Sequence, residues 1–132
     1  MKLLTRNIDY AVRALLYIAR SKKKVISVSE LVEELNLPKP FLRSVLQTLH
    51  KRKVLKAYKG YGGGFSLALS PRKIYLGELI RIFKGNIRLN ECIFKRKLCP
   101  NRNNCPLRRK IKEIENYVIS KLKSTTISSL LD

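Results

Sequence analysis

The sequence predicts a mainly α-helical fold with one small β-hairpin and a long C-terminal helix. Three observations predict it. Two short helical patterns within residues 27–53 are separated by a proline turn, a glycine-rich hairpin pattern follows at 54–69, and a heptad-like apolar repeat runs over 107–122. With 132 residues, the chain is long enough for one hydrophobic core with an appended element.

The strongest compositional feature is a net charge of +20, from 29 Lys and Arg against 9 Asp and Glu. A field of that sign favours nucleic acid or an anionic membrane surface as the partner. No apolar run approaches the ~18 residues that span a bilayer, and the N-terminus lacks a signal-peptide cleavage site. We therefore interpret the chain as a cytoplasmic protein without a membrane part. A ribosomal or merely lysine-rich protein is the alternative.

Residues 5–20 are predicted to form the first helix, because apolar residues recur there every three or four positions. Thr5 is the expected N-cap, since its hydroxyl can accept a hydrogen bond from the first helical turn. A polar, basic turn follows at 21–24. The residues expected on the inward face are Ile8, Ala11, Val12, Leu15, Leu16 and Ala19.

Two further helices follow in a helix-turn-helix pattern. Ser27 and Glu30 fit a capping box at the start of the first. Pro38 and Pro40 mark the turn and the opening of the second, which we expect to end near Lys53. The inward residues are Leu31, Val32 and Leu35 on the first helix, and Leu42, Val45, Leu46 and Leu49 on the second. The polar, basic outer face of the second comprises Lys39, Arg43, Ser44, Gln47 and Lys51.

A hairpin pattern directly after the second of these helices indicates a wing. Residues 54–58 and 65–69 are predicted strands, and the glycines of the turn KGYGGG let the backbone approach a phosphate or enter a groove. Lys56, Lys59 and Tyr61 add charge and an aromatic ring. A flexible tip that binds nothing is the alternative. A nucleotide-binding loop is disfavoured, because the motif G-x-x-x-x-G-K-[ST] is absent.

The C-terminal third contains two more predicted helices. Residues 74–83 have an amphipathic pattern with Leu76, Leu79, Ile80 and Phe83 inward, and Gly85 closes that helix. The helix over 107–122 has a narrow apolar stripe that suits packing on a second copy of the chain. Packing on the first helix of the same chain is the alternative. The stripe comprises Leu107, Ile111, Ile114, Val118 and Leu122. We expect no special role for the tail, TTISSLLD.

The three cysteines of the chain lie between these two helices, as Cys92, Cys99 and Cys105. An odd number argues against a secreted disulfide framework. Structural zinc usually takes four ligands at closer spacing, and the single histidine, His50, lies far along the chain. Wider gaps suit a loop around an iron–sulfur cluster. Because the segment is rich in Lys and Arg, a metal-free thiol switch is the main competitor.

Taken together, four segments resemble the IscR/NsrR-type winged helix-turn-helix transcription regulators: MKLLTRNIDYAVRALLYIA, the capped helix pair, the wing GYGGGF, and three cysteines before a long helix. The ending TTISSLLD is also similar. The resemblance spans essentially the whole chain. It implies a homodimer that binds a dyad-symmetric DNA operator, with one iron–sulfur cluster per subunit whose state changes that binding. Cys92, Cys99 and Cys105 match the family's cluster ligands.

The fourth cluster ligand differs between branches of that family. Arg108 stands where one branch has a histidine, and it cannot ligate iron. Asp9 stands where the nitric-oxide-responsive branch has an acid donated by the partner subunit, so the resemblance implies Asp9 as the fourth ligand. It also favours a 4Fe–4S over a 2Fe–2S cluster. The alternative for Asp9 is an exposed first-turn acid that the helix dipole stabilises.

In this interpretation the second helix of the pair enters the major groove of DNA. Arg43 is the best candidate for a base contact, because arginine pairs well with guanine. Ser44 and Gln47 are secondary candidates, and Tyr61 would lie at the minor groove. The residues expected on phosphates are Lys39, Lys51, Lys56 and Lys59.

We therefore predict a winged helix-turn-helix DNA-binding domain over residues 1–84, and a cysteine cluster loop with a dimerisation helix over 85–132. The function expected is a DNA-binding transcription repressor controlled by an iron–sulfur cluster that senses iron, redox state or nitric oxide. The alternatives are a metal-free thiol-switch regulator of the same fold and a basic RNA-binding or structural protein. An enzyme is not expected, because no nucleophile–base set is present.

Overall fold

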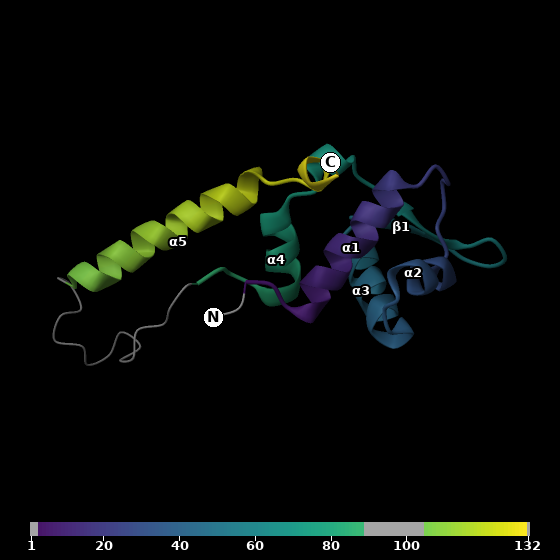
Figure 1. The fold of residues 1–132 in the computed structure, drawn as a ribbon, viewed down its shortest axis with the longest axis horizontal. Helices are drawn as coiled ribbons and strands as arrows, with labels where there is room; N and C mark the ends of the chain where they lie inside the picture. Colours follow the sequence, from purple (N-terminus) through teal and green to yellow (C-terminus); the bar gives the residue numbers. More distant parts are fainter. Residues whose placement is uncertain (1–2, 89–104, 132) are drawn as a thin grey trace.

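Helices dominate the structure, a computed structural model that describes residues 3–88 and 105–131 (Figure 1). The single antiparallel hairpin among these residues confirms the predicted class, mainly α with a small wing. Within them, no helix combines the length and apolar character needed to cross a membrane. The elements in order are α1 (Arg6–Arg20), α2 (Val28–Leu35), α3 (Lys39–Lys51), β1 (Leu55–Tyr58), β2 (Gly64–Leu67), η1 (Pro71–Lys73), α4 (Leu76–Lys84), α5 (Pro106–Ser124) and η2 (Ser128–Leu130).

Hydroxyl groups cap the first two helices, as predicted. The Thr5 side chain accepts a hydrogen bond from the Ile8 amide at 3.4 Å, and the Ser27 side chain accepts one from the Glu30 amide at 3.1 Å. Helix α1 packs against α3 and buries its inward face, which includes Ala14 and Ile18 in addition to residues predicted there. The core residues that α3 contributes are Leu42, Val45, Leu46 and Leu49, as predicted.

Helix α3 ends at Lys51, two residues before the predicted end. The reason is local, because Lys53 adopts a left-handed conformation with φ 65°. Its amide donates to the His50 carbonyl at 3.0 Å, and the Val54 amide donates to the Leu49 carbonyl at 2.9 Å. These bonds satisfy carbonyl groups of the last turn, so the chain leaves the helix and enters β1 directly.

The base of the wing is fixed to the segment that precedes α2. Ile26 and Phe65 exchange backbone hydrogen bonds of 2.9 and 2.8 Å. Gly64 has φ 153°, and a Cβ there would collide with the Ile26 carbonyl. Only glycine fits this position. The hairpin therefore cannot turn independently of α2. At the end of the hairpin away from the turn, β1 begins one residue later and β2 ends two residues earlier than predicted. The strands pair from Leu55↔Leu67 to Tyr58↔Gly64.

The C-terminal tail completes the core, so the expectation that it has no special role is wrong. The Leu76 amide donates to the Thr125 carbonyl at 2.8 Å, and the Ile127 amide donates to the Ile74 carbonyl at 2.9 Å. Ile127 is fully buried. This pairing also explains why α4 begins at Leu76 and not at Ile74, because Ile74 and Tyr75 form an extended segment beside the tail.

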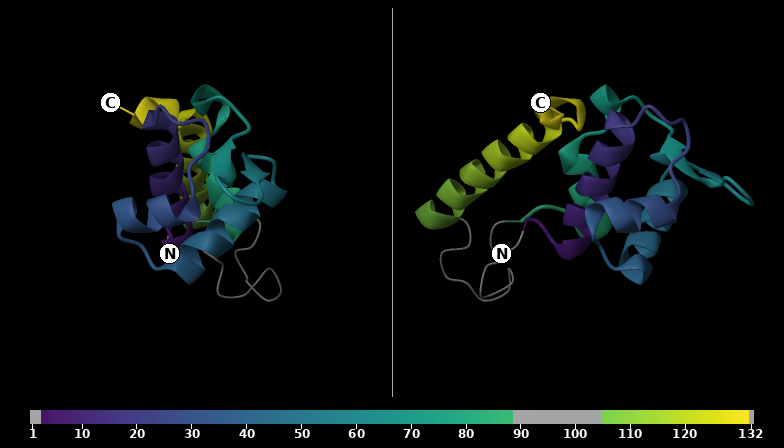
Figure 2. Two further views of the ribbon diagram at one scale, coloured as in Figure 1. Left: turned by 90° about the vertical axis from the view of Figure 1, so that its right-hand side faces the viewer. Right: turned by 45° about the vertical axis from the view of Figure 1, so that its right-hand side comes forward.

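Helix α5 projects from the body, and its C-terminal end, which leads into the tail, lies nearest to it (Figures 1 and 2). It packs against α4, where Gly77 lets the backbone of Leu122 come close. Among its described residues only Glu115 is buried, in an ion pair with Lys112 at 2.8 Å. The orientation of α5 therefore depends on the tail and on α4.

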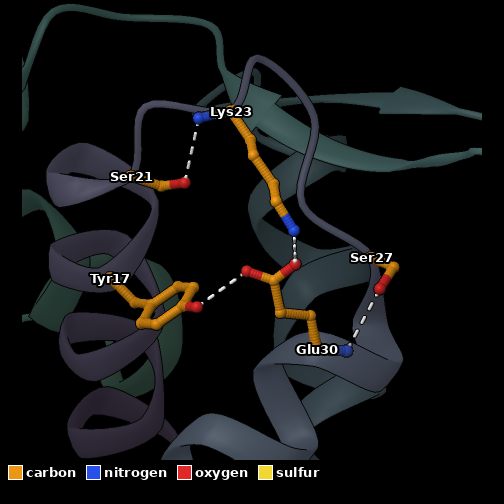
Figure 3. Close-up of polar contacts among 5 residues, drawn as sticks. All are labelled: Tyr17, Ser21, Lys23, Ser27 and Glu30. Atoms are coloured by element: carbon orange, nitrogen blue, oxygen red, sulfur yellow. Dashed lines mark hydrogen bonds and ion pairs between the residues drawn. The ribbon is translucent and has the colours of Figure 1, made fainter.

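The carboxylate of Glu30 joins α2 to α1 (Figure 3). It accepts hydrogen bonds from the Tyr17 hydroxyl at 2.7 Å and from the Lys23 ammonium at 2.8 Å. The capping box is thus only half formed, because this side chain turns to α1 and not to the Ser27 amide. The hydrogen bond from Lys23, and to a smaller extent the one from Tyr17, lowers the pKa of Glu30. The same contact raises the pKa of Lys23, and it raises the pKa of Tyr17 to about 12.

Replacing Glu30 with Gln should lower the free energy of unfolding at pH 7. Because the pKa of Glu30 is lowered below its ordinary value of 4.5 by folding, its stabilisation is present above that pH and is lost as the pH falls through the folded value. The stability difference between wild type and Glu30→Gln should therefore shrink between pH 7 and pH ~3. Urea denaturation at both pH values measures it. Glu33→Gln, an exposed change on the same helix, is the control. A difference that does not depend on pH would contradict this account.

Candidate nucleic-acid interface

The outer face of α3 carries no buried side chain. Because the helix buries every residue of its apolar stripe against α1, the residues between the stripe positions all turn outward. The structure thus brings the predicted set together on one exposed face of one helix. The exposed residues of this set are Lys39, Arg43, Ser44, Gln47 and Lys51. Such a surface can present an arginine fork to base edges and ammonium groups to phosphates.

The wing continues this basic surface directly after α3. Lys56, Lys59 and Tyr61 are all exposed, and the Tyr61 ring at the tip is covered by nothing. Gly60 and Gly62 take φ values of 84° and 76° in the turn, a backbone conformation that residues with a side chain rarely adopt. The tip is thus a narrow loop with one aromatic ring, and its base is held beside the helix pair by Ile26.

Asp9 lies in the first turn of α1, where it is about half exposed (47%). Its Oδ2 accepts a hydrogen bond from the Nε of Arg13 at 3.0 Å. A spacing of four residues on a helix favours such a pair, so the sequence could have indicated it. Within the described residues, no group of three or more His, Cys, Asp or Glu side chains is placed as for a metal. The proposed role of Asp9 therefore stays a prediction.

Cys105 is the N-cap of α5. Its Sγ accepts a hydrogen bond from the Arg108 amide at 3.4 Å, and the residue is partly exposed. Pro106 occupies the first helical position, where proline is favoured, and a Cys-Pro pair before a helical pattern could have signalled this cap. Cys92 and Cys99, the other two predicted ligands, lie outside the described residues.

The predicted dimerisation stripe is largely uncovered in the monomer. Leu107 is 70% exposed and Ile114 is 44% exposed, whereas Ile111, Val118 and Leu122 are partly covered. The side of α5 that faces α4 is a different one. A hollow of about 670 Å³ lies beside that contact, and its walls include Tyr75, Glu78, Arg81, Lys112, Glu115 and Ile119.

The chain is similar to known proteins over nearly its whole length. The family model Rrf2, described as an iron-dependent transcriptional regulator, matches residues 4–132. A candidate HTH-type transcriptional regulator of Aquifex aeolicus is 32% identical over 95% of this chain and 88% of that protein. The HTH-type transcriptional regulator NsrR of Shouchella clausii is 30% identical over 97% of this chain and 87% of that protein.

The fold has close counterparts among solved structures. CymR, the global cysteine regulator of B. subtilis, superposes with a TM-score of 0.80 at 22% identity, covering 99% of this chain and 97% of that one. At that identity the likeness shows the fold alone. The family model and both sequence relatives are described as transcriptional regulators, which supports the expectation that the chain is not an enzyme.

Arg43→Ala and Lys59→Ala should weaken DNA binding in different ways. Arg43→Ala should cost about 1–3 kcal/mol on the preferred duplex and relax sequence discrimination, because a base contact is lost. Lys59→Ala should weaken all duplexes alike and reduce the slope of log affinity against log salt by about 1, because a phosphate contact is lost. Fluorescence anisotropy with selected and random duplexes at several salt concentrations separates the two. If both variants lost affinity for the selected and the random duplex in the same ratio, base contact and phosphate contact would not be divided between Arg43 and Lys59.

Proposed function

The chain belongs to the Rrf2 family of transcriptional regulators, and on this premise we propose that it is a homodimeric repressor whose operator binding is controlled by an iron–sulfur cluster. Family membership confirms the resemblance to IscR/NsrR-type regulators and the predicted DNA-binding function. The control by a cluster is the further step. The observation that carries it is that Cys105, the last of three closely spaced cysteines, begins α5, and α5 is anchored to the winged body by the tail.

The position of Cys105 suits a thiolate ligand. Its sulfur already accepts an amide hydrogen bond, as cluster-bound cysteine sulfurs do, and this bond fixes the direction in which the sulfur points. The partial positive charge of a helix N-terminus favours a negatively charged group in the same place. When bound, a cluster would supply a centre that responds to iron supply, oxidants and nitric oxide. Cys92, Cys99 and Cys105 would hold it in each subunit.

We infer that Asp9 of the partner subunit completes the ligand set, which favours a 4Fe–4S over a 2Fe–2S cluster. Asp9 is half exposed in the first turn of α1 and is therefore accessible to a second copy of the chain. Arg13 holds one of its carboxylate oxygens from the next turn of the same helix. That ion pair would orient the second carboxylate oxygen of Asp9 toward the cluster, so Arg13 is a positioning residue in this proposal.

The homodimer is supported by the exposed stripe on α5. Leu107 and Ile114 expose apolar side chains to solvent in the monomer. Covering these side chains with a second copy would remove apolar area from water at a gain of roughly 25 cal/mol per Å². A dimer also suits a dyad-symmetric operator, because each half-site then meets one copy of α3.

A metal-free thiol switch is the second candidate, and one observation favours it. Cys105 is partly exposed at the start of a helix, and the segment 95–110 contains seven Lys and Arg residues and no acid. Such electropositive surroundings favour reactive cysteines. The two candidates share the DNA-binding surface and the dimer, and they differ in whether the thiols bind iron.

Anaerobic purification should give a brown protein with visible absorbance and about equal iron and acid-labile sulfide. Exposure to nitric oxide should bleach the absorbance and change the affinity for the operator. Cys105→Ser should lose most of the iron, because one of the cluster thiolates is removed. A colourless protein that contains no iron would favour the thiol switch.

Asp9→Ala should shorten the lifetime of the cluster in air without unfolding the protein, because it removes the fourth ligand. Arg13→Ala is the comparison variant: it keeps the carboxylate and removes only the ion pair that orients it, so it should shorten the lifetime less than Asp9→Ala does. The decay of visible absorbance measures the lifetime, and thermal unfolding checks the fold. If Asp9→Ala left the decay unchanged, Asp9 would not be a ligand. If both variants shortened the lifetime equally, the ion pair and not the ligand would be responsible.

A further inference from the structure

The first turns of α1 and α3 meet in an exposed contact between Arg6 and Phe41. The guanidinium carbon of Arg6 lies 3.9 Å from the centre of the Phe41 ring. This is well within the ~6 Å of a cation–π contact. The ring remains 42% exposed, so it does not belong to the core. A large apolar ring at the surface is thus covered in part by an arginine from a different helix.

Phe41 places this arginine at the edge of the DNA-reading face. Residues three apart are neighbours on a helix surface, so Phe41 lies beside Ser44, which belongs to that face. The next residue, Leu42, is fully buried. The Arg6 guanidinium therefore lies on the flank of α3, between the buried stripe and the outer face. No acid occupies the first turn of α3.

The guanidinium of Arg6 has no other partner within residues 3–88 and 105–131. No carboxylate or carbonyl there accepts a hydrogen bond from it, and the acid one turn away, Asp9, pairs with Arg13. Stacking on a ring engages the face of the guanidinium and leaves the N–H groups at its edge available. A flat guanidinium with free edges is suited to a bidentate contact with a phosphate.

We propose that Arg6 is a DNA phosphate contact at the flank of α3, and that Phe41 is the residue that positions it. The inference rests on DNA binding and does not depend on an iron–sulfur cluster. The aromatic ring holds a long side chain in one orientation before DNA arrives, so less side-chain freedom is lost on binding. The contact fixes the register of the helix on the duplex without reading its sequence.

The test uses the full-length protein and a random-sequence duplex of about 30 base pairs. Arg6→Ala should weaken binding about fivefold and reduce the slope of log affinity against log salt by about 0.9 for each bound subunit. Phe41→Leu should weaken it about two- to threefold with an unchanged slope, because the charge remains but is no longer oriented. Phe41→Tyr keeps the ring and should bind as wild type does. Arg72→Ala is the matched control, an exposed arginine on η1.

Arg72 lies at the other end of the body from Arg6. Its turn η1 packs on η2. Leu131, the residue after η2, accepts a hydrogen bond through its carbonyl from Arg20, which is the last residue of α1, whereas Arg6 is the first. If Arg6→Ala changed affinity and salt slope no more than Arg72→Ala does, the assignment would be overturned. The assignment would also be overturned if Arg6→Ala weakened DNA binding only in protein that still holds its metal and not after a chelator had removed it, because Arg6 would then act through the cluster.

Thermal unfolding of each variant shows whether a loss reflects destabilisation. If Phe41→Leu does not fold, Arg6→Ala and Arg6→Lys decide the question, since Lys restores the charge but not the flat fork. Arg6→Lys should recover the salt slope and only part of the affinity. No binding by the wild-type protein would overturn the DNA-binding premise itself, which is a different outcome from failure of the Arg6 assignment.

Discussion

The pairing of the tail with residues 74–76 determines where α5 lies. Ile127 is fully buried, and backbone hydrogen bonds join it and Thr125 to the segment before α4. Helix α5 buries little of its own surface among the described residues, so it is held mainly from its C-terminal end and by α4. Everything carried at its N-terminal end, including Cys105, is therefore positioned through the length of the helix. A sensor at that end is useful only if the other end is anchored.

The same principle extends through the body. Helix α4 packs on α1, α1 packs on α3, and Ile26 ties the wing to the start of α2. These contacts are backbone hydrogen bonds and close-packed apolar residues, which shift between discrete arrangements and do not deform gradually. In the proposed function, a change at the start of α5 would reach α3 through this series of packed elements. Asp9 and Arg6 lie one turn apart on α1, so this helix would link the other subunit's proposed cluster to the proposed DNA contact.

Local patterns were sufficient to predict the helices, two of the caps and the exposed face of α3. The hydroxyls of Thr5 and Ser27 act within one turn of their own helices, so the sequence alone specifies them. The tail was missed because the burial of Ile127 depends on a segment about fifty residues earlier in the chain. The partners of Glu30 were missed for the same reason, since a capping box and a long-range contact compete for one carboxylate. The cluster ligands came from a family resemblance and stay a prediction.

The central claim is that the tail holds α5 in place, and hydrogen exchange of Ile127→Ala tests it most directly. Truncating a buried Ile costs about 2–5 kcal/mol, so protection of the Leu76 and Ile127 amides should fall at least about tenfold. The amides of α5 should lose protection with them, whereas those of Leu46 and Leu49 in α3 should keep more of theirs. Leu130→Ala, on the partly exposed side of the tail, is the control. Unchanged protection of α5 in Ile127→Ala would contradict the account.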